Sequence, residues 1–126
     1  MKGTGVAVYQ IYYYRDSNGA EPVKEYIEKL ATTQSKNGRI NYRKIIEYLD
    51  ALEEYGLALS EPKIKHIDGD ICELRPIRNR IFFAAWAEDG FVLLHYFIKK
   101  TEKTPQREKN TAIRRLEELR KENEQP

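Results

Sequence analysis

Residues 71–105 hold three apolar runs separated by turn signals, and this spacing limits the possible folds more than any other feature of the chain. Asp89-Gly90 lies between the last two runs, and Asp68-Gly69 lies just before the first. Asp-Gly pairs favour the tight turns that join antiparallel strands. The pattern therefore predicts a meander, in which each strand pairs with the next one along the chain. Its expected strands are residues 63–67, 71–77, 81–87 and 91–98, with a further turn at Arg78-Asn79.

The remaining apolar pattern predicts one strand and two helices before the meander, and one helix after it. Residues 6–14 are rich in Val, Ile and Tyr, which favours a strand, and their tyrosines suit either a sheet margin or a base-stacking surface. Apolar stripes with helical spacing predict helices over about 22–32 and 40–55. Thr104-Pro105 is typical of a helix start. The fold class is α+β, with the first strand and a helical hairpin packed on a curved antiparallel sheet of four to five strands.

Length and composition favour a single domain in a reducing compartment. A chain of 126 residues with 40% hydrophobic residues suits one domain over 1–126, and its polar tail, 121–126, is expected to fray. The single cysteine, Cys72, excludes an internal disulfide. No apolar run approaches the ~20 residues that cross a bilayer. The start of the chain is too polar after Val8 for a signal peptide. We therefore expect a soluble, cytoplasmic protein without membrane contact.

Positive charge is concentrated on the predicted meander. The formal net charge is only +2, although 33% of the residues are charged. Residues 62–109 carry ten basic and seven acidic side chains, whereas residues 1–61 carry eight and nine. A polyanion would therefore bind at the sheet.

Motifs that identify several enzyme classes are missing from the sequence. His66 and His95 have no Cys or carboxylate at metal-ligand spacing, so no metal is expected. The chain also lacks a Gly-rich phosphate loop and a nucleophile elbow. We expect no cofactor.

Strand alternation places a carboxylate and several cations on one face of the sheet. In strand 71–77, Glu73 and Arg75 point to the face opposite the helical hairpin. Arg80 begins the next strand and Lys100 follows the last one, so the three cations are expected to converge. Such a cluster suits RNA cleavage, in which the ribose 2′-OH attacks the phosphate and preorganised cations stabilise the dianionic transition state.

RNA cleavage also needs a general base and a general acid. Glu73 is the nearest carboxylate for the base, and His95, His66 or a lysine suits the acid. Each residue also has a purely structural interpretation. Glu73 and Arg75 would form a surface ion pair contributing ~0–1 kcal/mol. His95 would be a hydrogen-bonded histidine of the core. Lys63, Lys65 and His66 would protect an edge strand from aggregation.

Three segments resemble the RelE/ParE toxin superfamily, and most closely its phage-derived HigB-like branch. They are Glu73-Leu74-Arg75, the run RIFFAAW from Arg80, and FIKKTEKTP from Phe97 to Pro105. The last segment is the most specific of the three. The resemblance implies a metal-independent endoribonuclease that cuts messenger RNA in the ribosomal A site and inhibits translation. It also implies neutralisation by a HigA-like helix-turn-helix antitoxin, through which the complex binds operator DNA.

Two other functions fit the same resemblance or the bare fold. ParE-like relatives poison DNA gyrase and cut no RNA, and a non-catalytic α+β interaction domain would do neither. The family's phosphate-binding residues correspond to Arg75, Arg80 and Lys100. RelE-type nucleases carry two lysines along the first strand of the meander, and the corresponding positions here hold Ile71 and Glu73. They also use a tyrosine in the last helix, where this chain has about Gln106, so these roles are unfilled at those positions. The candidate RNA-binding residues that surround the site are Lys63, Lys65, His66, Arg78, Lys99 and Lys103.

Overall fold

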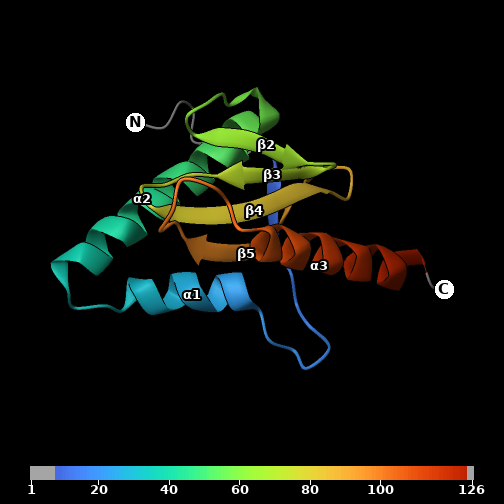
Figure 1. The fold of residues 1–126 in the computed structure, drawn as a ribbon, viewed down its shortest axis with the longest axis horizontal. Coiled ribbons are helices and arrows are strands. Elements are labelled where there is room, and N and C mark those ends of the chain that lie inside the picture. The colour runs from blue at the N-terminus through green and yellow to red at the C-terminus, as the bar shows by residue number, and fades with distance from the viewer. Residues whose placement is uncertain (1–7, 125–126) are drawn as a thin grey trace.

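A five-stranded sheet lies between a helical hairpin and a C-terminal helix (Figure 1). The computed structural model describes residues 8–124. The strands are β1 (Gln10–Tyr13), β2 (Ile64–Asp68), β3 (Ile71–Leu74), β4 (Asn79–Trp86) and β5 (Gly90–Ile98). The helices are α1 (Pro22–Ala31), α2 (Lys36–Tyr55), the short 3₁₀ helix η1 (Gly56–Ala58) and α3 (Gln106–Glu124). This order confirms the predicted α+β class.

The meander is present as predicted, and β1 adds a fifth strand at its edge, parallel to β5. Strands β2 to β5 pair in sequence order and antiparallel, giving the sheet order β1-β5-β4-β3-β2. β1 pairs parallel to β5, with Gln10 opposite Gly90. A Cβ at Gly90 would lie 2.1 Å from the Gln10 carbonyl oxygen, so glycine is required for this pairing. The predicted strand 6–14 is shorter than expected, and its residues 6 and 7 lie outside the described residues.

Several predicted element boundaries are wrong. α2 begins at Lys36 instead of residue 40, because Ser35 caps the helix and its hydroxyl accepts the Gly38 N–H at 3.0 Å. α3 continues through Glu124, so residues 121–124 of the tail expected to fray belong to the helix, and residues 125 and 126 lie outside the described residues. Arg120 helps to hold this end, since its Nη2 donates to Asp70 Oδ2 at 2.8 Å.

The turn between β3 and β4 also differs from the prediction. β3 ends at Leu74, and β4 begins at Asn79, which was expected in the turn. The Asn79 side chain is buried and accepts a hydrogen bond from Tyr26 Oη at 2.6 Å. It donates to Asn41 Oδ1 at 2.7 Å. These bonds satisfy a buried amide and tie the start of β4 to both helices of the hairpin.

Each face of the sheet has its own core. The hairpin packs on one face through Val23, Ile27, Ile45, Leu49 and Leu52, against Ile64, Leu74, Ile81, Phe83, Phe91 and Leu93. α3 packs on the other face through Ala112 and Leu116, against Tyr14, Ile71, Phe82, Ala84, Val92, Leu94 and Phe97. The loop between β5 and α3 runs beside the ends of β3 and β4 (Figure 1). The candidate site lies there.

Candidate functional site

A buried ionic cluster lies where β3 ends and β4 begins. We call Glu73, Arg75 and Arg80 the active cluster. The register of β3 and β4 sets Leu74 opposite Ile81, which brings Arg75 alongside Arg80. Glu73 Oε1 lies 3.4 Å from Arg75 Nε and 3.9 Å from Arg80 Nε. The Glu73 side chain is only 2% exposed and that of Arg75 is 22% exposed, so the pair is not the exposed surface pair considered from the sequence.

A strained turn holds the Arg80 guanidinium in place. Arg80 Nη1 donates to the Ile77 carbonyl at 2.8 Å and to the Asn79 carbonyl at 2.9 Å. Ile77 has a φ of 59°, a left-handed conformation that a β-branched residue rarely adopts. Strain of this kind persists only where the surrounding structure imposes it, and it is common at functional sites.

The active cluster retains unused hydrogen-bonding capacity. Glu73 Oε2, Arg75 Nε and Arg80 Nε are buried without a hydrogen-bond partner among the described residues. Burial raises the pKa of the Glu73 carboxyl, and the positive charges of Arg80 and Arg75 oppose that rise. Buried polar atoms usually have hydrogen-bond partners, which makes these three atoms candidates for contact with a bound group.

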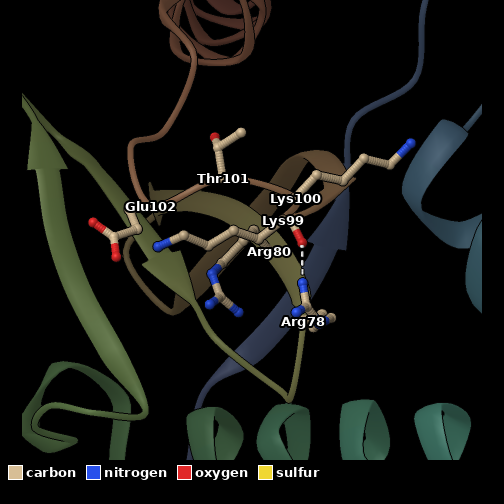
Figure 2. A pocket seen from close by; sticks show the side chains of 6 residues that line it. All are labelled: Arg78, Arg80, Lys99, Lys100, Thr101 and Glu102. Carbon is tan, nitrogen blue, oxygen red and sulfur yellow. Dashed lines mark hydrogen bonds between the residues drawn. The ribbon is translucent and has the colours of Figure 1, made fainter.

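The first of two basic hollows lies over Arg80. Its volume is about 500 Å³, and its lining residues are Arg78, Arg80, Lys99, Lys100, Thr101 and Glu102. Figure 2 shows the Lys100 side chain pointing away from the Arg80 guanidinium, whereas Lys99 extends over it towards Glu102. Arg78 Nη1 donates to the Lys99 carbonyl at 3.0 Å (Figure 2). The structure therefore places Lys99, and not Lys100, beside the active cluster.

The second basic hollow adjoins the first and includes Glu73 and Arg75. It has a volume of about 370 Å³ and shares Lys99 and Glu102 with the first. Its other lining residues are Lys65, His66, Ile67, Lys103, Thr104 and Lys109. Among the described residues, none of the lysines in either hollow forms an ion pair with a carboxylate.

Lys109 is a site residue that the sequence analysis missed. It lies in the first turn of α3, where the chain returns to the sheet. The helix start expected at Thr104-Pro105 was the available signal, because a helix beginning there brings its first turn close to the preceding basic loop.

Two predicted residues lie away from the hollows. Lys63 Nζ lies 5.3 Å from the centre of the Tyr48 ring, against α2. His95 is partly buried under α3, where its Nε2 lies 2.8 Å from Glu108 Oε1. Burial lowers the pKa of His95, and the hydrogen bond to Glu108 opposes that change. His95 thus has the environment of a hydrogen-bonded core histidine.

His66 remains at the candidate site. It lines the second basic hollow, and its Nε2 lies 2.6 Å from the Gly69 carbonyl oxygen. In residues 8–124, no three His, Cys, Asp or Glu side chains are gathered as metal ligands. None of the described helices has the length and apolarity needed to cross a membrane.

Fold and site together define a small α+β protein that presents an open, cation-rich site beside a buried Glu–Arg cluster. The family model described as Phage derived protein Gp49-like (DUF891) matches residues 25–117, which include every residue of both hollows. The chain therefore belongs to this phage-derived, Gp49-like family. Membership is compatible with the toxin of a toxin–antitoxin system. A comparison with curated proteins gives no match.

Proposed function

We propose that this protein is a HigB-like toxin, a ribosome-dependent endoribonuclease that cleaves messenger RNA without a metal and so inhibits translation. The observation that carries the proposal is the active cluster, a buried carboxylate between two arginines. It borders two open hollows rich in lysines that form no ion pair within residues 8–124. Family membership is compatible with a toxin and supports the same reading.

In the proposed reaction, the ribose 2′-OH attacks the neighbouring phosphorus and the 5′-oxygen leaves. The products are a 2′,3′-cyclic phosphate and a free 5′-hydroxyl. Arg75 and Arg80 bind the phosphate oxygens as negative charge develops on them. Arg80 suits this role because two backbone carbonyls already fix its guanidinium, so little reorganisation is needed in the transition state.

Glu73 is the proposed general base. Its Oε2 has no hydrogen-bond partner among the described residues, and the carboxyl borders the second hollow. Burial raises its pKa, which makes the ionised carboxylate a stronger base.

His66 is the proposed general acid. It lines the same hollow as Glu73, whereas His95 is under α3. Its Nε2 lies against the Gly69 carbonyl oxygen, so Nδ1 is the nitrogen that would donate a proton to the leaving 5′-oxygen.

The proposed substrate is messenger RNA in the ribosomal A site, and the proposed partner is a HigA-like antitoxin with a helix-turn-helix. The two hollows are open to solvent and basic, which suits an exposed single strand with its phosphates outward. The antitoxin would neutralise the enzyme and carry the complex to operator DNA.

Mapping of messenger RNA ends after induced expression tests this function. We expect new ends within coding regions for the wild type and for Arg43→Ala, whose side chain is exposed on α2 away from the site. We expect none for Arg80→Ala. Intact messages together with a DNA-damage response would replace this proposal with a gyrase toxin. Normal growth would leave only an interaction domain.

A further inference from the structure

A groove lies next to the first basic hollow, on the side of the helical hairpin. It has a volume of about 820 Å³ and lies between α1, the N-terminal half of α2 and the ends of β4 and β5. Its apolar lining comes from Tyr26, Leu30, Ile77, Tyr96 and Ile98. Arg78 lines both the groove and the hollow, so the two adjoin at this residue.

Two large aliphatic side chains are exposed in this groove. Ile77 is 45% exposed and Ile98 is 49% exposed. Neighbouring exposed aliphatics beside a concave surface are typical of protein interaction sites. Ile77 adopts its left-handed φ of 59° here, in the same turn whose carbonyl holds Arg80. The turn therefore serves the groove and the active cluster together.

The floor of the groove is already formed. The rings of Tyr26 and Tyr96 stack with their centres 4.0 Å apart. The Tyr26 hydroxyl donates to Asn79, and Asn79 in turn donates to Asn41. These bonds join α1, α2 and β4, so a ligand would find the groove without prior rearrangement.

Charge and side-chain type together indicate the kind of partner. The charged residues that line the groove and the adjoining hollow are Lys29, Arg78, Arg80, Lys99 and Lys100, opposed by Glu25 and Glu102. This excess of cations favours an acidic ligand. An RNA base would stack on a free aromatic face. Here the two tyrosines stack on each other, and the exposed contacts are aliphatic, which favours a protein.

We propose that this groove binds an acidic, amphipathic segment of the antitoxin. Aliphatic side chains of that segment pack on Ile77 and Ile98, and a carboxylate pairs with Arg78. From Arg78 the segment continues over the first hollow and excludes RNA. The inference rests on the proposed function in one respect, since that function makes the partner an antitoxin.

Titration calorimetry with the purified product of the adjacent reading frame tests this interface. Ile98→Glu places a negative charge in the groove and should weaken binding about tenfold or more. Ile98→Lys loses the same apolar contact but keeps the favourable charge, and should weaken binding less. Leu57→Glu is the matched control, because Leu57 is 55% exposed at the other end of α2, and its affinity should stay within about twofold of wild type. In cells, Ile98→Glu should remain toxic in the presence of the antitoxin.

Equal affinities for wild type and Ile98→Glu would overturn the inference, as would an adjacent product that does not bind the wild type. Loss of binding to a single-stranded RNA oligonucleotide by Ile98→Glu, with antitoxin affinity retained, would assign the groove to RNA instead. Calorimetry is carried out without RNA. Suppose that the wild-type protein binds the antitoxin through the groove but cuts no messenger RNA. That result would reject the proposed ribonuclease activity and would still support the groove as the antitoxin-binding surface.

Discussion

Two clusters of partly or fully buried charge lie on the same face of the sheet, and they differ in how completely their members are paired. The first is the active cluster at the ends of β3 and β4. The second lies under α3, and we call it the α3 network. Its members are Tyr14, His95, Glu108, Arg115 and Glu118.

The α3 network pairs almost every polar group with a neighbour. Tyr14 Oη donates to Glu118 at 2.6 Å, and burial together with this contact raises the pKa of Tyr14 to about 12. Arg115 donates to the Leu94 carbonyl at 2.8 Å and lies 4.9 Å from the centre of the Tyr14 ring. Its Nε is the one buried atom of the network without a partner among the described residues. The network therefore holds α3 on the sheet.

In the active cluster, three buried atoms have no hydrogen-bond partner within the described part of the chain, and the cluster borders two hollows. Since unpaired buried groups destabilise a fold, a cluster that keeps them gains little stability from its charges. The charges of the α3 network hold a helix on the sheet, whereas we propose that those of the active cluster bind a ligand. Five predictions test this separation.

Glu73→Gln should have the largest effect on cleavage. Removing a general base typically lowers the rate by about 10²–10⁴. The wild-type rate should rise with pH as Glu73 ionises, and the rise should be centred above the ordinary carboxyl value of 4.5 because burial raises this pKa. Single-turnover cleavage on programmed ribosomes measures both effects. A variant as fast as the wild type would make Glu73 only an ion-pair partner.

Glu73 should also make the stability of the protein depend on pH, in the direction opposite to its effect on the cleavage rate. The folded protein binds the Glu73 proton more tightly than the unfolded chain does, because burial raises the folded pKa. Stability is therefore lost as pH rises from about 4.5 through the folded pKa. Glu73→Gln should show a smaller loss over that window in denaturant titrations. A steeper loss would contradict the assigned direction of the shift.

Arg80→Ala should lower cleavage by roughly 10²–10³, the usual cost of removing one preorganised charge contact. Arg75→Ala should behave similarly, with both variants folded by circular dichroism and still bound by the antitoxin. The exposed Arg43→Ala serves as the control. Retained toxicity in both site variants would eliminate the proposed phosphate site.

Lys99→Ala and Lys100→Ala should differ from each other. Lys99 borders both hollows, whereas Lys100 points away from Arg80 (Figure 2). We expect about a tenfold loss of cleavage for Lys99→Ala, as one phosphate contact is lost, and about a twofold loss for Lys100→Ala. The reverse order would show that Lys100 turns towards the substrate when RNA binds. Cleavage rates of the two variants at equal ionic strength decide the matter.

His95→Gln should affect stability and leave cleavage nearly unchanged. Burial holds the pKa of His95 below its ordinary value of 6.5, although Glu108 opposes this and Arg115 and Arg114 favour it. The unfolded chain then binds the proton more tightly, so wild-type stability is lost as pH falls below about 6.5. The variant should lose about 1 kcal/mol at neutral pH and respond less to acid. Denaturant titrations at several pH values measure this, and a large loss of cleavage would place His95 in the reaction.

Local signals were enough to predict most of the fold. Asp-Gly turns and strand alternation predicted the meander, and apolar stripes predicted the helical hairpin. The predicted element bounds are wrong where contacts with residues distant in the sequence determine where a strand begins or ends. β1 is short and parallel because it pairs with β5, whose Gly90 allows the close approach. Asn79 begins β4 because both hairpin helices bond its side chain.

The candidate site was predicted in part for the same reason. Alternation put Glu73 and Arg75 on one face, but it contains no information on burial, so a buried pair was taken as a possible surface pair. The orientations of Lys99 and Lys100 depend on the path of the loop before α3, which sequence spacing does not define. The position of Lys109 beside them depends on how α3 docks.

We propose that the active cluster, and not the α3 network, cuts messenger RNA. Parallel end-mapping of messages from cells expressing Arg80→Ala and His95→Gln tests it most directly, with equal protein levels confirmed by immunoblot. The account predicts that new coding-region ends vanish with Arg80→Ala and persist with His95→Gln. Ends that persist with Arg80→Ala, or that vanish with a folded His95→Gln, would contradict it.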